Sequence, residues 1–323
     1  MMLQCRNVLS RRVAWLAVVI LAPTVALAAN YPRLTVSELR AKYLDSGGRI
    51  ATIDGVEVHY RDEGQGPAIL MIHGSQSTLR TWDFIAPLLQ RNYRVIRYDI
   101  PPQGLSGPVS DEAAAHVEPA SFAIHLLDSL GVDRVTCVGV SSGGTTCMYI
   151  AADFPDRVDR LILSNTPSDP VSTGHITFTP EFADAQREAK ETGFQSERFW
   201  NSFLDFFSGE PSRLSREIRT QYYDFNRRVI EKNYTALIGL VADHDKASAA
   251  MARVRAPTLL IWGGRDALLV PASADKLAGY LSSTQVSKVM LPDVGHYPPL
   301  EVPVRFAQLT SAYIEAATPQ LRP

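Results

Sequence analysis

A serine flanked by glycines stands where the sequence changes from a buried strand to a helix. Residues 139–144 read Gly-Val-Ser-Ser-Gly-Gly, which fits the pattern G-x-S-x-G with Ser141 at its centre. A sharp strand-to-helix turn of this kind, a nucleophile elbow, strains the serine backbone, and Gly139 and Gly143 leave the room that it needs. The pattern predicts an exposed nucleophilic hydroxyl, although alone it also fits a plain glycine-rich turn.

A serine hydroxyl becomes a good nucleophile only when a base takes its proton, so a histidine and an acid should follow further along the chain. Asp266 comes after the apolar run Thr258–Trp262, and His296 comes after Val286–Leu291. The carboxyl ends of parallel strands meet at one edge of a sheet. We therefore predict that Ser141, His296 and Asp266 form a catalytic triad in which Asp266 orients the base.

Several residues compete for these roles. Asp293 is a rival acid, but it shares a loop with His296, where we expect it to order the turn. The remaining histidines are weaker candidates for the base: His59, His73, His125, His175 and His244. Of these, His175 and His244 lie in a stretch that could contact the substrate.

The loop after the first buried strand should supply part of an oxyanion hole. Transition-state oxyanions need N–H donors that are aimed in advance, and we assign the donors to the backbones of Ser75 and Ser142. We expect His73, in the same loop, to form hydrogen bonds within it rather than to react. The sequence shows no zinc-type cysteine pair, no H-E-x-x-H and no P-loop lysine. It therefore predicts no metal and no cofactor.

Alternating strands and helices must position these residues. The predicted strands are 49–53, 56–61, 68–72, 93–98, 135–140, 158–164, 258–262 and 286–291. The helices expected around them are 31–44, 121–130, 143–153, 272–281 and 304–316. The repeated β-α pattern predicts an α/β fold with a mostly parallel, eight-stranded sheet covered by helices on both faces. The hairpin at Asp54-Gly55 adds antiparallel strands at one edge.

The stretch 165–249 interrupts the alternation. It lacks convincing strands, and its many aromatic residues are interleaved with charges at helical spacing. We interpret it as a helical cap inserted between core parts 29–164 and 250–323, over the carboxyl edge of the sheet. Its aromatic side chains should form an apolar pocket wall, unless they serve only to join the cap to the core.

The first 28 residues have the features of an export signal. Arg6, Arg11 and Arg12 precede the apolar run Val13–Leu27, and Ala26-Leu27-Ala28 is a small-x-small cleavage pattern. The run is short for a membrane span, and Pro23 interrupts it, which favours a cleaved signal peptide (residues 1–28) over an anchor. We therefore predict an exported bacterial protein, periplasmic or secreted, with no stable membrane insertion after cleavage.

Composition narrows the class of partner. The 323 residues are 46% hydrophobic and carry a formal net charge of −2, with no block of like charge. This balance predicts a folded core, and nothing in it indicates nucleic acid or an anionic membrane surface as a partner. We expect the partner to be a small-molecule substrate. Export permits a disulfide between Cys137 and Cys147, but the spacing alone cannot show one, and we expect two buried thiols rather than a bridge. The oligomeric state is also open.

Jointly, these motifs make the chain similar to the α/β-hydrolase superfamily, in the capped group near AB hydrolase-1. The resemblance covers nearly everything from Ile50 to Ile314, and its marks are Asp54-Gly55-Val56…His59-Tyr60, His73-Gly74, Arg97-Tyr98-Asp99…Gly104-Leu105-Ser106, the Ser141 elbow, Trp262-Gly263-Gly264-Arg265-Asp266 and Gly295-His296…Glu301-Val302-Pro303. One departure is Pro101-Pro102-Gln103-Gly104, where relatives often carry Pro-Gly-aromatic-Gly.

The resemblance implies a serine hydrolase, but it is far less specific for the substrate. From the triad and the aromatic residues of the insertion, we predict cleavage of the carboxylic ester of a small hydrophobic or aromatic substrate through an acyl-enzyme on Ser141. C–C bond hydrolases and lactonases use the same triad and remain alternatives. Epoxide hydrolases and haloalkane dehalogenases of the family use an aspartate nucleophile, which Ser141 argues against. A non-catalytic binding protein of the same fold is the alternative from another class.

Overall fold

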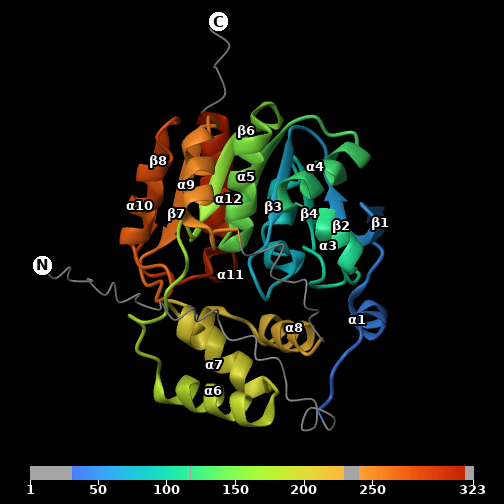
Figure 1. Ribbon diagram of the computed structural model, residues 1–323, viewed down its shortest axis with the longest axis vertical. Coiled ribbons are helices and arrows are strands. Elements are labelled where there is room, and N and C mark those ends of the chain that lie inside the picture. Colours follow the sequence, from blue (N-terminus) through green and yellow to red (C-terminus); the bar gives the residue numbers. More distant parts are fainter. Residues whose placement is uncertain (1–30, 117, 229–239, 317–323) are drawn as a thin grey trace, which may run out of the picture.

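In the computed structural model, which describes residues 31–116, 118–228 and 240–316, eight strands form one sheet. Their order across the sheet is β1-β2-β4-β3-β5-β6-β7-β8 (Figure 1). The strands are β1 (Arg49–Ile53), β2 (Val56–Glu63), β3 (Ala68–Ile72), β4 (Arg94–Tyr98), β5 (Val135–Val140), β6 (Val158–Ser164), β7 (Thr258–Gly263) and β8 (Val286–Leu291). The pairs β1–β2 and β2–β4 are antiparallel and all others are parallel, which confirms the predicted sheet.

The sheet begins with the predicted hairpin. Asp54 and Gly55 both have positive φ, 49° and 79°, which is the geometry that a tight two-residue hairpin turn requires. In the parallel part, the register places Gly139 of β5 between Ile72 of β3 and Leu163 of β6. The strand that leads to Ser141 therefore lies inside the sheet, with a parallel neighbour on each side.

Helices cover both faces of the sheet (Figure 1). The helical segments of the core are α1 (Val36–Tyr43), η2 (Leu79–Trp82), α2 (Ala86–Leu89), α3 (Asp111–His116), α4 (Pro119–Ser129), α5 (Ser142–Asp153), η3 (Pro155–Arg157), α9 (His244–Arg253), α10 (Ala272–Tyr280), α11 (Pro298–Glu301) and α12 (Pro303–Ala316). Alternate side chains of each central strand enter different apolar clusters. Leu260 and Trp262 of β7 belong to the cluster that contains residues of α4, α5, α9 and α10. Leu259 and Ile261 belong to the other cluster, which contains residues of η2, α2 and α12. This burial on both faces explains the continuous apolar runs of the parallel strands.

In the described part of the chain between β6 and α9, three helices form a separate layer below the sheet in Figure 1. They are α6 (Pro180–Thr192), α7 (Glu197–Phe207) and α8 (Arg216–Asn226), with the short η4 (Pro211–Arg213) between the last two. The hydroxyls of Thr179, Ser196 and Ser215 cap their amino ends. We call α6–α8 the inserted helices.

The inserted helices do not account for the whole range 165–249. Helix α9 begins at His244, and its Ala247, Ala250 and Met251 pack in the same apolar cluster as α5, on a face of the sheet. The predicted division into a cap and two core parts itself stays a prediction. The predicted signal peptide, residues 1–28, lies outside the described residues. Within them, no helix combines the length and the apolarity needed to cross a bilayer.

Candidate active site

Ser141 occupies the strained turn that the motif predicts. It lies between β5 and α5 with φ 54° and ψ −129°, a conformation that residues with a side chain rarely adopt. A Cβ on Gly139 would lie 2.5 Å from the carbonyl carbon of Gly143, and a Cβ on Gly143 would overlap the carbonyl oxygens of Ile72 and His73. Both glycines are therefore required by close backbone approach, and Ser141 remains half-buried at the turn.

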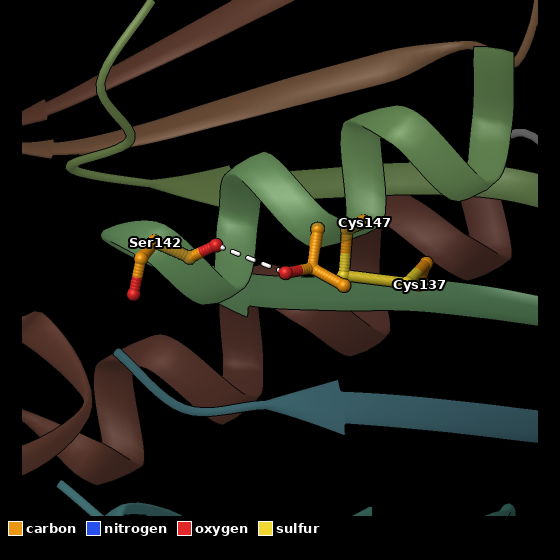
Figure 2. Close-up of a disulfide and its surroundings, with 4 residues drawn as sticks. Cys137, Ser142 and Cys147 are labelled. Carbon is orange, nitrogen blue, oxygen red and sulfur yellow. Dashed lines mark hydrogen bonds between the residues drawn. A yellow bond between two sulfur atoms is a disulfide. The ribbon is translucent and has the colours of Figure 1, made fainter. Parts of the chain in front are cut away.

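A disulfide brackets this turn. Cys137 of β5 and Cys147 of α5 are bonded, with their Cα atoms 5.7 Å apart, and both are fully buried (Figure 2). The expectation of two free thiols was wrong, because the turn folds α5 back along β5 and brings residues ten apart in sequence into bonding distance. The elbow is thus closed by a covalent link as well as by its backbone.

The residues assigned to the oxyanion hole lie beside the elbow. The Ser75 hydroxyl is 2.9 Å from the Ser142 hydroxyl, and Ser142 is the first residue of α5, whose positive end faces this point. A Cβ on Gly74 would lie 3.0 Å from the Ser141 Cβ, so the loop packs directly against the nucleophile candidate. The structure brings Ser75 and Ser142 together next to Ser141.

His296 and Asp266 form a buried pair. His296 Nδ1 lies 2.7 Å from Asp266 Oδ2, and each residue is only 3% exposed. Oδ1 of Asp266 accepts the N–H groups of Leu268 and Leu269 at 2.8 and 3.0 Å. The carboxylate is therefore fixed in orientation and holds one ring nitrogen of the histidine, leaving Nε2 for other chemistry.

The Ser141 elbow and the histidine pair are linked through β6. The backbone N–H of Ser141 donates to the carbonyl of Ser164 at 2.9 Å, and the next residue, Asn165, contacts Asp266. Among the described residues, no hydrogen bond joins the Ser141 hydroxyl to the His296 imidazole. In enzymes without substrate such bonds are often long and tighten only in the complex.

Asn165 is a residue of this site that sequence reasoning missed. It is fully buried with φ 43°, and its Nδ2 donates to Asp266 Oδ2 at 2.6 Å while its Oδ1 accepts the Gly263 N–H at 3.2 Å. Asparagine tolerates this left-handed backbone better than most residues. A signal was present in the sequence, because Asn165 is a polar residue directly after an apolar strand, as Ser141 is.

The rival acid has other partners. Asp293 accepts hydrogen bonds from Arg213 at 2.7 Å and from Arg305 at 3.1 Å, near the surface. These two guanidinium groups lower the pKa of Asp293 to about 2. The structure places Asp293 in an ion-pair group that holds its loop, and pairs His296 with Asp266 instead.

Four other histidines form hydrogen bonds or ion pairs with groups other than Ser141. His73 donates from Nδ1 to the carbonyl of Gly74 and accepts the Ile100 N–H on Nε2, and burial lowers its pKa, so it is held neutral inside its loop. The remaining pairs are His59 with Asp99, His125 with Asp54 and His244 with Asp169. Among the described residues, no group of histidine, cysteine, aspartate and glutamate is arranged to hold a metal ion.

The aromatic residues of the inserted helices mostly pack on one another. Phe182 contacts the rings of Phe178, Phe199, Phe203, Phe206 and Phe207, and together these residues form the apolar core of the inserted helices. Phe207 brings this cluster close to the histidine, with its ring centroid 6.4 Å from that of His296. A cavity between α8 and the loop after Ser75 is lined by residues that include Ser77, Thr81, Tyr222 and Leu300.

A strained serine directly after a central parallel strand, with a buried histidine–aspartate pair in the loops after two other strands of the same sheet, is the arrangement of the α/β-hydrolase class. Residues 67–303, well over half of the chain, match the model of the alpha/beta hydrolase fold family. The chain belongs to that family, and it is a hydrolase of the α/β fold.

Relatives in the family catalyse different reactions. The chain is 25% identical to 2-hydroxymuconate semialdehyde hydrolase of Pseudomonas sp. (strain CF600), over 84% of this chain and 94% of that protein. It is 28% identical to haloalkane dehalogenase 2 of Mycobacterium tuberculosis, over 77% and 88% of the two chains. The structure of a hydrolase from Pseudomonas aeruginosa PA01 covers 83% of this chain and 98% of its own, with a TM-score of 0.65 and 25% identity.

Proposed function

We propose that the protein is a serine hydrolase that cleaves the carboxylic ester of a small hydrophobic or aromatic substrate. One observation carries the proposal: Ser141 stands in the left-handed turn between β5 and α5, while a buried His296–Asp266 pair follows β8 and β7 at the same sheet edge. These are the parts that acyl transfer requires, a nucleophile and an oriented base.

In the proposed cycle, His296 takes the proton of Ser141 as the hydroxyl oxygen attacks the ester carbonyl. Backbone N–H groups of Ser75 and Ser142 stabilise the oxyanion, and His296 then protonates the leaving alcohol. Water repeats the sequence on the acyl-enzyme and releases the acid. The residues that act are all supplied by the chain, and we propose no cofactor.

The choice of substrate rests on what lies beside the histidine. The rings of Phe207 and Tyr297 approach His296, with centroids 6.4 and 5.2 Å from it, and Leu268 and Ala267 are partly buried nearby. This apolar surrounding favours a hydrophobic acyl or alcohol group and the exclusion of water. The partner is accordingly a small molecule.

Labelling with a fluorophosphonate tests the nucleophile. Wild-type protein should be labelled at Ser141 and should hydrolyse p-nitrophenyl esters, whereas Ser141→Ala should do neither and should unfold at nearly the same temperature. Asp266→Asn should lower kcat by about 10⁴-fold if Asp266 orients the base, and Asp293→Asn serves as the matched control with little effect. Turnover of esters by Ser141→Ala would remove the assignment.

C–C bond hydrolysis is the second candidate, favoured by the similarity to 2-hydroxymuconate semialdehyde hydrolase over 94% of that protein. The same triad would serve, but the bond broken lies between two carbons of a coloured dienoate. Loss of dienoate absorbance without ester turnover would select this reaction. Similarity to a haloalkane dehalogenase carries less weight, because the family's dehalogenases use an aspartate where this chain has Ser141.

A further inference from the structure

The proposed mechanism does not use one buried carboxylate near His296. It contacts the segment between β8 and α11, residues 292–297, which we call the histidine loop. Glu301, the last residue of α11, is 5% exposed. Its Oε1 accepts the N–H of Gly295 at 2.9 Å, and its Oε2 accepts the N–H groups of Gly209 and Glu210 at 2.9 and 3.2 Å. Gly295 precedes His296, whereas Gly209 and Glu210 follow α7. One carboxylate therefore joins the inserted helices to the histidine loop.

Other contacts run along the same junction. The backbone N–H of His296 itself donates to the carbonyl of Phe207 at 2.7 Å, and the Arg265 guanidinium donates to the carbonyl of Gly209 at 3.0 Å. A Cβ on Gly209 would lie 2.6 Å from the nitrogen of Gly295, so the two backbones touch. We call residues 207–210 the strap, because they hold the histidine loop from the side of the inserted helices.

Backbone N–H groups are the hydrogen-bond donors to the Glu301 carboxylate. Burial raises the pKa of Glu301, and the N–H groups of Gly295, Gly209 and Glu210 act in the opposite direction. Among the residues that the structure describes, no lysine or arginine forms an ion pair with it. A buried carboxylate satisfied only by backbone N–H groups costs desolvation energy that an apolar residue would not. Its placement at this junction therefore suggests a role beyond stability.

We propose that Glu301 is a positioning residue for His296. By binding the strap with one oxygen and the histidine loop with the other, it fixes the backbone of His296 so that the imidazole stays on Asp266. The inference rests on the proposed function, since it takes His296 to be the base. In this proposal the strap is fixed to the histidine loop and helps to hold His296 in place, so it does not act as a mobile lid.

Glu301→Gln tests the proposal, because the amide keeps one acceptor oxygen and turns an NH₂ group toward the other N–H donors. We expect kcat to fall by about 10–100-fold, as for other residues that orient a functional group, with KM within about twofold. The downfield NMR resonance of the proton between His296 Nδ1 and Asp266 should shift or broaden. A residue that only stabilises the fold would leave that resonance and kcat unchanged.

Asp224→Asn is the matched control. Asp224 is a carboxylate with 3% exposure that binds Lys42, Tyr43 and Arg227 and ties α8 to α1, away from the histidine. Its loss should lower the unfolding temperature while kcat and the histidine resonance stay as in the wild type. Equal behaviour of Glu301→Gln and this control would overturn the proposal.

A second variant keeps the test decisive if Glu301→Gln does not fold. Gly209→Ala retains the carboxylate but pushes the strap away from Gly295, so it should cause the same loss of kcat and the same change in the resonance. Wild-type kinetics in that variant would overturn the proposal. Absence of fluorophosphonate labelling in the wild type would instead refute the proposed function, while a changed resonance in Glu301→Gln would still support the positioning role.

Discussion

Asp266 Oδ2 receives hydrogen bonds from two side chains at once, His296 Nδ1 at 2.7 Å and Asn165 Nδ2 at 2.6 Å. The carboxylate cannot rotate toward solvent without losing both, nor without losing the N–H groups of Leu268 and Leu269 on its other oxygen. At the scale of the residue, the orientation of the base is therefore determined by Asn165 as well as by Asp266.

We accordingly predict that Asn165→Ala lowers kcat with little effect on KM and lowers the free energy of unfolding by about 1–3 kcal/mol, the cost of an unsatisfied buried group. Asn165→Gly is the control for backbone strain, because glycine accepts the φ of 43° but lacks the amide. Steady-state kinetics and urea unfolding measure both effects. Equal kcat in Asn165→Gly and wild type would show that the amide does not orient the acid.

At the scale of the element, the disulfide joins the strand and the helix that carry the elbow. Cross-linking residues ten apart removes loop entropy from the unfolded chain, so Cys137→Ala/Cys147→Ala should lose about 3 kcal/mol of unfolding free energy. The esterase activity per folded molecule should persist, since the Ser141 backbone keeps its bond to Ser164. Urea midpoints of the two proteins measure the effect, and an unchanged midpoint would contradict it.

The loop between β8 and His296 should show a distinct pH dependence. Because Arg213 and Arg305 lower the pKa of Asp293 from 3.8 to about 2, the contribution of this group to stability is present above pH 3.8 and is lost as the pH falls toward 2. An NMR titration of the Asp293 carboxyl should give a midpoint near 2, and Arg213→Ala should raise it. A midpoint near 4 in the wild type would show that the ion pairs do not form in solution.

The sequence predicts an element well where the spacing of its apolar residues matches the faces that the element buries. All eight strands have the predicted bounds within two residues, because runs such as 68–72 and 135–140 are apolar on both faces. Short segments such as α11 were not predicted, because they have too few residues to show a repeating pattern of apolar positions. Ser141, Asp266 and His296 could be proposed from strand ends. The bonds of Asn165 and Glu301 could not, because they depend on how distant loops meet.

At the scale of the whole molecule, the disulfide and the predicted signal peptide support each other. A bond between Cys137 and Cys147 persists in oxidising compartments, which is where an exported chain arrives. We therefore propose that the protein is periplasmic or secreted. Expressed in bacteria with its own amino terminus, it should be recovered outside the cytoplasm, beginning at Ala29 and free of thiols. Mass spectrometry measures both properties, and an intact chain retained in the cytoplasm would contradict the proposal.

The course of α12 decides how the molecule can be attached to a surface. This helix (Pro303–Ala316) begins next to the histidine loop and runs toward the end of the sheet that lies away from α6–α8 (Figure 1). If the protein were attached to a resin or electrode through the carboxyl end of α12, the edge of the sheet that carries Ser141 would face the solution. The immobilised protein should therefore still bind dissolved esters.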